Sequence, residues 1–404
     1  MTAIVIVGAG HAGVQAAVSL RDDGFTGAIT LLSAEADFPY QRPPLSKAFL
    51  KGQSDLAGLP LKAAQFFEDH RIDVALGVAV TRIDCAAQRV TLSTGGKAPY
   101  DHLILATGAR ARALRAPGLH LAGVHVLRTI HDAARLKQRL ATARRLVVVG
   151  AGFIGLEVAA TACALGLSVT VVEIADRPMG RAVSPATSSF FDAAHRAFGV
   201  DFRFGVGVAA LHGGTSVSEV ELSDGARVPA DLVLVGVGVV AEDALASAAG
   251  IACSDGVLVD ETLLSSEPHV SAIGDCARFT YEGARTRLES VQNAADQAKC
   301  VASRLMGKPQ PYAALPWFWS DQGDLKLQIA GLSRDVDRWV ARGGVDRRAL
   351  TVFGFAGDRL KAVETVNRGA DHMSARRLLA AQTPLTPDQA ADENLDLRKL
   401  ALAR

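Results

Sequence analysis

Cysteine is scarce in this chain, and its placement excludes several kinds of chemistry. The 404 residues contain five cysteines, scattered with no Cys-x-x-Cys pair: Cys85, Cys163, Cys253, Cys276 and Cys300. A disulfide framework, a zinc site and a local redox dithiol all need cysteines at short, regular spacings. None of the three is therefore expected.

Histidine spacings typical of metal sites are also missing. The ten histidines show no H-x-x-x-H or H-E-x-x-H pattern, which would place two ligands on one face of a helix. His120, His125 and His131 come close together in the sequence. We expect these three to lie in loops rather than on a metal ion.

The chain lacks an excess of either charge and lacks a long apolar run. Lys plus Arg number 43 against 42 Asp plus Glu, so the net charge indicates neither a nucleic-acid partner nor an anionic membrane. The most apolar runs, such as 232–240, are shorter than about 18 residues and are broken by glycine, so no membrane span is expected. The first glycine-rich loop begins at Gly8, which leaves no room for a signal peptide before it and predicts a cytoplasmic protein. A length of 404 residues allows two or three domains.

One glycine-rich loop occurs twice. Each copy follows a short apolar run, has the pattern G-x-G-x-x-G and leads into a segment of small, helix-forming residues. The glycines are Gly8, Gly10 and Gly13 in the first copy and Gly150, Gly152 and Gly155 in the second. The first glycine of such a loop makes the turn, the second lets the backbone approach a pyrophosphate, and the third lets the helix pack on the strand. Because the helix N-terminus then faces the anion, two copies predict two bound dinucleotides.

An acidic residue is expected about 20 residues after each loop, where it binds the adenosine ribose. In the second copy a predicted strand ends on Glu173, whose carboxylate would repel a 2′-phosphate, so NADH is predicted rather than NADPH. Arg177 and Arg181 lie just downstream and would attract such a phosphate instead. In the first copy the strand runs into Ser33 and the acid comes later, at Glu35. Either Glu35 reaches back to the ribose or backbone groups hold it.

Two further apolar runs mark where the chain changes domain. The run 103–109 is a predicted buried strand that ends in a small-residue turn, and 232–240 is a similar run with glycine at its turn. The second glycine loop lies between them, so its domain is predicted to be an insertion into the first. After the return, Asp275 follows a strand-like run and a glycine. An aspartate there would bind a cofactor hydroxyl, or it would cap a turn.

Eight segments together form a specific pattern over nearly the whole chain. They are the first glycine loop, RPPLSKAFL (42–50), LATGAR, VLRTIHDA (126–133), GAGFIGLEVAATA, IGDCARF, ESVQNAADQA (289–298) and PWFWSDQ (316–322). With these segments the chain resembles the FAD-dependent, NADH-oxidising ferredoxin reductases of the putidaredoxin reductase type, which belong to the glutathione-reductase-like flavoproteins.

The resemblance implies an α/β fold with two Rossmann-like dinucleotide-binding domains and a C-terminal α/β domain. An FAD-binding domain would comprise 1–110 and 242–322, an inserted NADH-binding domain 111–241, and a C-terminal interface domain 323–404. The implied FAD residues are Gly8, Gly10, Ala12, Gly13, Ala34, Glu35, Arg42, Lys47, Val80, Ala106, Thr107, Gly108, Arg128, Gly274, Asp275, Val291 and Trp319. The residues implied for the inserted NADH domain are Gly150, Gly152, Phe153, Ile154, Gly155, Glu173 and Gly238.

Lys47 follows a segment stiffened by Pro43 and Pro44, at what we expect to be the start of a helix. In the resembled family a lysine here pairs with the glutamate of the second glycine motif, which is Glu157 in this chain. Lys47 would favour the electron-rich reduced flavin, and Glu157 would keep it oriented near the nicotinamide. The alternative interpretation is a solvated lysine and an exposed glutamate on a helix.

With no cysteine pair beside the flavin, electrons would have to leave from the flavin itself or by a path to a one-electron acceptor. Trp317 and Trp319 alternate as they would on a strand, with Phe318 between them. Aromatic residues at this spacing usually fill a core or an interface. In the resembled family this segment lies beside the flavin, and Trp319 would shield the ring or line the exit path. Lys47, Glu157 and Trp319 are therefore the predicted catalytic residues.

The resemblance implies that the electrons pass singly to a [2Fe–2S] ferredoxin that supplies a cytochrome P-450 monooxygenase. The basic segment 334–348 and Lys299 would dock an acidic ferredoxin, or they are ordinary solvated faces. The alternatives are a reductase for a Rieske dioxygenase ferredoxin, for rubredoxin or for a small quinone or radical acceptor, and a flavoprotein whose interactions NADH switches. We expect a monomer or a weak homodimer.

Overall fold

The computed structural model describes residues 2–402, and the chain divides into two compact units. Unit 1 comprises Met1–Gln41, Asp55–Arg110 and Val239–Ala314, and unit 2 comprises Arg42–Ser54, Ala111–Gly238 and Leu315–Arg404. Each unit is therefore assembled from segments that are far apart in the sequence. The chain leaves unit 1 for 13 residues at 42–54 and for a longer excursion after Arg110.

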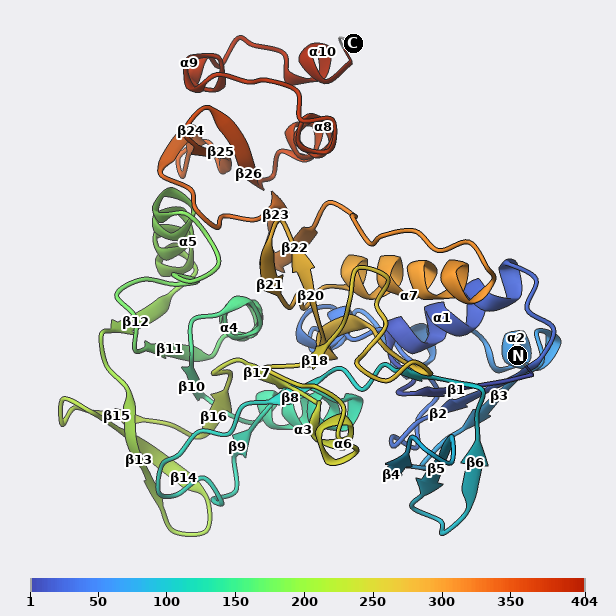
Figure 1. The fold of residues 1–404 in the computed structure, drawn as a ribbon. Coiled ribbons are helices and arrows are strands. Elements are labelled where there is room, and N and C mark those ends of the chain that lie inside the picture. The colour runs from blue at the N-terminus through green and yellow to red at the C-terminus, as the bar shows by residue number, and fades with distance from the viewer. Residues whose placement is uncertain (1, 403–404) are drawn as a thin grey trace. The chain divides into compact units, whose positions relative to one another are not determined.

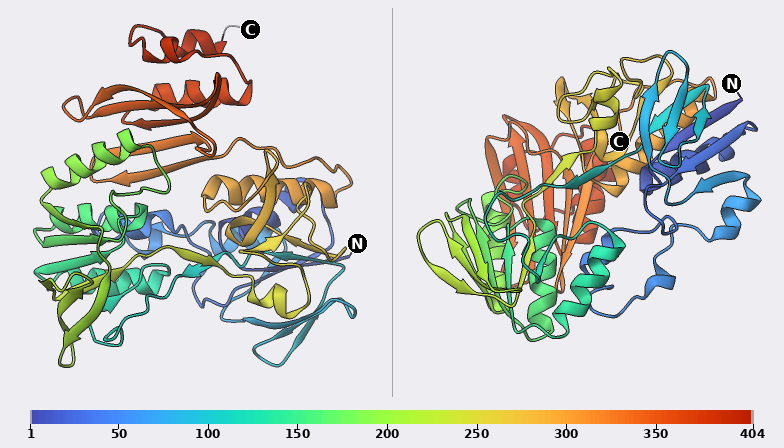
Figure 2. Two further views of the ribbon diagram at one scale, coloured as in Figure 1. Left: turned by 60° about the vertical axis from the view of Figure 1, so that its left-hand side comes forward. Right: turned by 90° about the horizontal axis from the view of Figure 1, so that it is seen from below.

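Unit 1 is built on a five-stranded parallel sheet in the order β19-β7-β1-β2-β3. The strands are β1 (Ala3–Val7), β2 (Ala28–Leu32), β3 (Ile72–Ala75), β7 (His102–Leu105) and β19 (Val270–Ala272). Neighbouring residues of a strand point to opposite faces, and four successive residues are buried in both β1 and β7, so both faces of the sheet are covered. Helices α1 (His11–Asp22) and α7 (Val291–Leu305) pack side by side in this unit (Figure 1, Figure 2).

Smaller elements complete unit 1. An antiparallel sheet β4-β5-β6 follows β3, strands β18, β20 and β21 form a further sheet, and β8 pairs with β17. The bounds are η2 (Leu56–Gly58), α2 (Ala64–Asp69), β4 (Val80–Asp84), β5 (Arg89–Leu92), β6 (Lys97–Pro99), β8 (Ala109–Ala111), β17 (Val239–Ala241), α6 (Ala244–Ala248), β18 (Val257–Leu258), η3 (Gly274–Cys276), β20 (Ala277–Tyr281) and β21 (Ala284–Thr286).

Unit 2 contains a second parallel sheet, in the order β12-β11-β10-β16-β9. Its strands are β9 (Val124–His125), β10 (Arg145–Val149), β11 (Ser168–Glu173), β12 (Val200–Phe204) and β16 (Leu232–Val235). The associated helices and hairpin strands are α3 (Ile130–Leu140), α4 (Phe153–Ala164), α5 (Pro185–Ala197), β13 (Val208–Gly213), β14 (Val217–Leu222) and β15 (Arg227–Pro229). The short 3₁₀ helix η1 (Pro43–Ser46) also belongs to unit 2.

The two parallel sheets follow one plan. In each, a strand, a glycine loop and a helix lead to a second and a third strand, then to a three-stranded antiparallel sheet, and the next strand returns beside the first. The returning strands are β7, whose Ile104 pairs with Ile6, and β16, whose Leu234 pairs with Val148. This strand order is that of a Rossmann-like dinucleotide-binding fold, so the expected fold class is confirmed.

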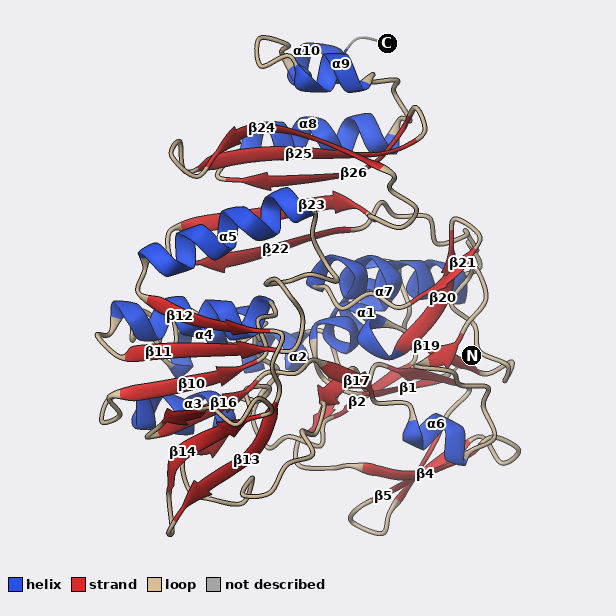
Figure 3. Ribbon diagram, turned by 90° about the vertical axis from the view of Figure 1, so that its left-hand side faces the viewer, coloured by secondary structure: helices blue, strands red, loops and turns tan. Residues whose placement is uncertain are grey.

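The C-terminal part of unit 2 is an antiparallel sheet in the order β22-β23-β26-β25-β24 (Figure 3). Its elements are β22 (Trp317–Gln322), β23 (Leu325–Gly331), β24 (Arg338–Gly344), β25 (Ala349–Ala356), β26 (Arg359–Val366), α8 (Gly369–Ala380), α9 (Pro387–Ala391) and α10 (Leu397–Leu402). Six successive residues of β25 are buried because α8 covers the sheet on one side and α5 contacts β25. Phe353 and Phe355 lie in the hydrophobic core that this sheet forms with α8.

Two local expectations are wrong. Lys47 does not begin a helix: the 3₁₀ helix that starts with Pro43 and Pro44 ends at Ser46, and Lys47 follows it with φ −128°. The two prolines suit the first turn of a helix, but the turn does not continue beyond Ser46. His125 lies in β9 rather than a loop, because it pairs with Leu234 of β16. His131 lies in α3, whose start is set by a capping box between Thr129 and Asp132.

Two kinds of feature are missing from the described residues. Among residues 2–402, no group of three or more His, Cys, Asp or Glu side chains is placed to hold a metal ion. Within the same range, no helix has both the length and the apolar character needed to cross a bilayer.

Candidate active site

The first glycine loop has the geometry of a pyrophosphate cradle. Gly8 has a φ of +108°, and a Cβ atom there would lie 2.2 Å from the carbonyl oxygen of Ala106. A Cβ atom on Gly13 would lie 1.9 Å from the carbonyl oxygen of Gly8, so only glycine lets α1 approach the loop this closely. A Cβ atom on Gly10, in contrast, would meet nothing within 4 Å. The middle glycine thus borders open space, where a pyrophosphate fits.

The second loop repeats this geometry. Gly150 has a φ of +102°, and its added Cβ atom would lie 2.5 Å from the carbonyl oxygen of Gly236. A Cβ atom on Gly155 would lie 2.2 Å from the carbonyl oxygen of Gly150, whereas one on Gly152 would meet nothing within 4 Å. No side chain caps α1 or α4, whose N-cap residues are Gly10 and Gly152. The first N–H groups of both helices therefore fit the anionic groups of FAD and NADH.

Glu173 is held against its own glycine loop. Its Oε2 atom accepts a hydrogen bond of 2.7 Å from the backbone N–H of Ala151, and its Oε1 atom accepts one of 2.9 Å from Ala175. These bonds place a carboxylate at the edge of the loop, as ribose binding requires. Arg177 donates to the carbonyl oxygens of Gly180 at 2.7 Å and Val183 at 3.1 Å. Arg177 thus braces the chain downstream of the strand.

Glu35 has a different environment from Glu173. Its carboxylate accepts a short hydrogen bond from the hydroxyl of Tyr40, and its backbone carbonyl accepts one of 3.0 Å from Ser33. Ala34 lies between Ser33 and Glu35, two positions after the end of β2. The Tyr40 contact orients the Glu35 side chain along its own loop.

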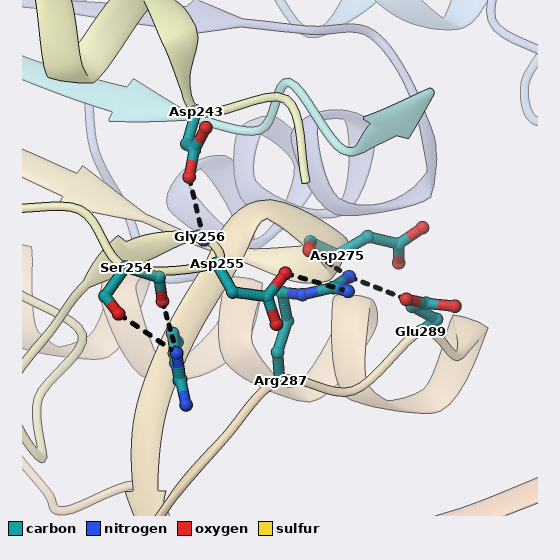
Figure 4. A network of polar contacts seen from close by, with 8 residues as sticks. Asp243, Ser254, Asp255, Gly256, Asp275, Arg287 and Glu289 are labelled. Atoms are coloured by element: carbon teal, nitrogen blue, oxygen red, sulfur yellow. Dashed lines mark hydrogen bonds and ion pairs between the residues drawn. The ribbon is translucent and has the colours of Figure 1, made fainter. Parts of the chain in front are cut away.

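Asp275 lies in a short turn that the side chains of Gln297 and Arg287 brace. Gln297 of α7 accepts a hydrogen bond of 2.7 Å from the N–H of Gly274. Arg287 donates at 3.2 Å to the carbonyl oxygen of Asp275 and at 2.6 Å to Glu289, and its other amino group lies 3.5 Å from Asp255 (Figure 4). Neither Arg287 nor Gln297 was predicted from the sequence. Gln297 lies within the ESVQNAADQA segment, one of the eight that carry the resemblance, and that segment was the signal by which Gln297 could have been found.

Lys47 and Glu157 meet in unit 2. Lys47 Nζ lies 2.9 Å from Glu157 Oε1, with Lys47 18% exposed and Glu157 2% exposed. Ser320 donates to the same oxygen at 2.6 Å, and Ser46 donates to Oε2 at 2.5 Å. Neither serine was predicted. The alternative of a solvated lysine and an exposed glutamate is wrong, because α4 buries Glu157 against η1 and β22.

Strand β22 presents different residues on its two faces. The rings of Trp317 and Trp319 lie on one face with their centroids 5.6 Å apart, and the guanidinium of Arg376 lies 4.6 Å from the Trp317 ring. On the other face Phe318 contacts Phe153 of α4, with 4.6 Å between ring centroids. Phe153 and Ile154 are the first two residues of α4, and Ile154 is exposed.

The remaining predicted residues divide between the units. Unit 1 contains Ala12 in α1, Val80 in β4, Ala106, Thr107 and Gly108 after β7, and Val291 at the start of α7. Thr107 donates a hydrogen bond of 2.6 Å to the carbonyl oxygen of Glu242. In unit 2 Arg42 donates to the carbonyl oxygen of Arg128 at 2.8 Å, which brings these two predicted residues together. Gly238, with a φ of +95°, is the last residue of the middle segment of unit 2, before the chain returns to unit 1 at Val239.

The basic segment 334–348 is largely engaged within unit 2. Arg342 is buried and donates to the carbonyl oxygens of Gln389, Ala390 and Leu395. Arg347 pairs with Glu393 at 2.6 Å and Arg348 pairs with Asp324 at 2.5 Å. In unit 1 Lys299 pairs with Asp296 at 3.4 Å. These contacts weaken the case for the segment as a basic docking face.

Comparisons with known proteins agree over almost the whole chain. Residues 2–298 match the family described as pyridine nucleotide-disulphide oxidoreductase, and residues 317–401 match the family described as reductase C-terminal. Rhodocoxin reductase of Rhodococcus erythropolis is 51% identical over 404 residues, which cover 99% of this chain and 94% of that protein.

Two solved structures superpose closely. The ferredoxin reductase for the CYP199A2 system of Rhodopseudomonas palustris has a TM-score of 0.97 and 47% identity, and the match covers 99% of this chain and all of that one. The reductase in a covalent putidaredoxin reductase–putidaredoxin complex has a TM-score of 0.96 and 38% identity, with coverage of 99% and 98%.

Proposed function

The chain belongs to the pyridine nucleotide-disulphide oxidoreductase family, and within it we propose an NADH-dependent ferredoxin reductase that carries FAD. One observation carries this proposal: both glycine loops have the full cradle geometry, and Glu173 marks the second as the NADH loop. The five cysteines are all free, so the chain has no disulfide to take electrons from the flavin. A separate acceptor must therefore take them.

The chemistry of the bound groups is simple, so the protein contributes mainly positioning and electrostatics. Bound FAD would supply the conversion of one two-electron hydride transfer from NADH into two one-electron transfers. NAD⁺ and one proton leave, and two one-electron acceptors are reduced for each NADH. Lys47, held by Glu157, would place a positive charge where the reduced flavin gains electron density. The Gly152 loop and Glu173 would hold the two ends of NADH.

A [2Fe–2S] ferredoxin is the proposed acceptor, and a cytochrome P-450 is the proposed terminal enzyme. The two solved structures support this proposal, since one is of a reductase joined to putidaredoxin and the other is of the ferredoxin reductase for the CYP199A2 system. Trp319 would shield the flavin or line the electron path. We propose a cytoplasmic protein, a monomer or a weak homodimer, with FAD bound by 1–110 and 242–322, NADH by 111–241 and an interface formed by 323–404.

Stopped-flow absorbance tests the proposal in two stages. NADH should bleach the yellow protein within milliseconds to seconds, and NADPH should do so at least tenfold more slowly. Turnover with a [2Fe–2S] ferredoxin should then be seen, and a fall with rising salt would show that opposite charges steer the encounter. Fast bleaching without ferredoxin turnover would reject the acceptor and direct the search to rubredoxin or a small quinone. No bleaching by NADH would reject the proposed function.

A further inference from the structure

A chain of buried hydrogen bonds runs from Glu157 to His195 through strand β22. Ser320 Oγ lies 2.6 Å from Glu157 Oε1, and Gln322 Nε2 lies 3.2 Å from Ser320 Oγ. At the far end, His195 Nε2 of α5 lies 2.8 Å from Gln322 Oε1. All four side chains are 2% exposed or less, so bulk water does not compete for these partners.

The chemistry of these groups sets the direction of every bond. An ionised carboxylate only accepts, so Ser320 must donate its proton to Glu157. The Ser320 oxygen then accepts from the amide N–H of Gln322, which leaves the Gln322 oxygen to accept from His195. His195 must therefore carry its proton on Nε2. The donor groups of His195, Gln322 and Ser320 thus point one after another toward Glu157.

The second ring nitrogen of His195 supports this direction. Nδ1 is buried without a hydrogen-bond partner among the described residues. If the Gln322 amide were rotated by half a turn, its N–H would face His195 Nε2, which would then have to accept. The proton of His195 would move to Nδ1 and become a buried donor without a partner, which is costly. The Ser320 hydroxyl would then also face an amide oxygen that competes with Glu157. Burial lowers the pKa of His195 to about 4, so the ring stays neutral near pH 7.

Strand β22 connects these hydrogen bonds to the aromatic pair Trp317 and Trp319. Alternate residues of a strand point to opposite faces, so Ser320 faces α4 while its neighbour Trp319 faces the other way beside Trp317. Lys47 and Ser320 share one oxygen of Glu157. Turning that carboxylate would therefore move the ammonium group of Lys47.

We propose that Ser320 is a positioning residue for the Lys47–Glu157 pair, and that Gln322 and His195 hold its hydroxyl proton toward Glu157. This inference rests on the proposed function, because the pair affects hydride transfer only if NADH reduces a bound FAD. Ser320 is fully buried, and it acts on Glu157 and through it on Lys47.

The kinetic test compares Ser320→Ala, Ser320→Thr and Ser188→Ala in single-turnover reduction at rising NADH. Ser320→Ala should lower the limiting rate about tenfold and leave the half-saturating NADH concentration within twofold. Ser320→Thr keeps the hydroxyl and should restore at least half of the rate. Ser188, whose buried hydroxyl donates at 2.6 Å to the carbonyl of Pro178, is the matched control and should change neither value. Equal slowing by both alanine variants, or no slowing by Ser320→Ala, would overturn the proposal.

The tautomer of His195 gives a readout that needs no turnover. Nitrogen-15 NMR of histidine-labelled protein should show His195 as the neutral Nε2–H form at pH 7, with the signal assigned by its loss in His195→Asn. Gln322→Met should change that signal and slow flavin reduction less than Ser320→Ala does. An Nδ1–H tautomer in the unmodified protein would contradict the direction of the chain and overturn the proposal.

Amine labelling of Lys47 gives the second independent readout. In Ser320→Ala, Lys47 should react at least threefold faster with an acylating reagent, measured by mass spectrometry against Lys299 as the internal reference. Unchanged labelling would overturn the positioning role. If NADH fails to reduce the unmodified protein, the proposed function fails, whereas the labelling and tautomer results still show whether Ser320 positions the pair.

Discussion

Glu157 is a buried carboxylate whose compensating charge comes from Lys47. The two serine hydroxyls satisfy its remaining lone pairs, but they bring no charge. Removing one member of a buried ion pair leaves the other uncompensated, and this costs more than the intact pair contributes. The pair should therefore affect both stability and rate.

Lys47→Met should lower the free energy of unfolding of unit 2 by about 2–3 kcal/mol and slow flavin reduction by NADH at least tenfold. Adding Glu157→Gln removes the stranded charge, so the double variant should recover most of the stability but not the rate. Urea unfolding and stopped-flow reduction measure the two quantities. Arg347→Met, which breaks an exposed pair with Glu393, is the control and should change neither. A double variant that regains the rate would remove Lys47 from the mechanism.

Glu173 should set the preference between NADH and NADPH. Glu173→Ala removes both the acceptor for ribose hydroxyls and the repulsion of a 2′-phosphate. The kcat/KM for NADH divided by the kcat/KM for NADPH should therefore fall at least tenfold. Asp176→Ala changes an acidic residue three positions further on and should leave the ratio unchanged. A constant ratio in both variants would show that the ribose is recognised by other residues.

The residues that sequence analysis missed around this site lack a local pattern. Ser46 and Ser320 reach Glu157 from 111 and 163 positions away, and serine has many uses in a fold. Lys47, in contrast, could be identified because the whole RPPLSKAFL segment carries the resemblance. Arg287 was missed because its role is to hold the backbone of Asp275, which leaves no spacing rule in the sequence.

At the scale of elements, the glycine loops and their strands were the most predictable part of the chain. The strands predicted to run into Ser33 and to end on Glu173 correspond to β2 (Ala28–Leu32) and β11 (Ser168–Glu173), because a buried parallel strand needs a continuous apolar run. The segment around Lys47 was less predictable. Two prolines set φ for a first turn but do not determine whether the turn continues, and here it ends at Ser46.

The glycines within one loop should respond differently to alanine. Gly155→Ala forces a Cβ atom to 2.2 Å from the carbonyl oxygen of Gly150, so unit 2 should lose more than about 3 kcal/mol of stability or fail to fold. In Gly152→Ala the added Cβ atom meets no protein atom within 4 Å, so the protein should fold and stay yellow. The same atom would keep the pyrophosphate from the backbone, so the dissociation constant for NADH should rise at least tenfold.

Gly214→Ala is the control for this comparison, because its Cβ atom also meets nothing within 4 Å and it lies between β13 and β14, away from the loop. It should keep both stability and NADH binding. Calorimetry and NADH titration separate the outcomes. Weakened NADH binding in Gly214→Ala, or unchanged binding in Gly152→Ala, would argue against a pyrophosphate at the second loop.

At the scale of the whole molecule, the distribution of tryptophan allows one unit to be followed separately. The three tryptophans are Trp317, Trp319 and Trp339, and all belong to unit 2. Tryptophan fluorescence therefore reports the unfolding of unit 2. Because FAD would stabilise whichever unit binds it, unfolding should be compared at one fixed FAD concentration.

Buried histidines should make both units sensitive to acid. Burial lowers the pKa of His102 in unit 1 to about 3, and that of His195 and His372 in unit 2 to about 4. A histidine in the unfolded chain has a pKa near 6.5, so below that pH the unfolded state binds more protons than the folded state. The stability from these neutral rings is complete above about pH 6.5 and is lost as the pH falls toward 4.

His372→Phe tests this account in unit 2. His372 packs against Trp317 with 5.9 Å between ring centroids, and neither of its nitrogens has a hydrogen-bond partner among the described residues, so a phenyl ring can replace it. Arg376 adds to the lowering of its pKa, after burial. The variant should unfold at a similar urea concentration at pH 7 and at a higher one at pH 5, with the pH slope reduced by up to about 1.4 kcal/mol per unit. An identical pH 5 midpoint in both proteins would show that this ring does not contribute to acid sensitivity.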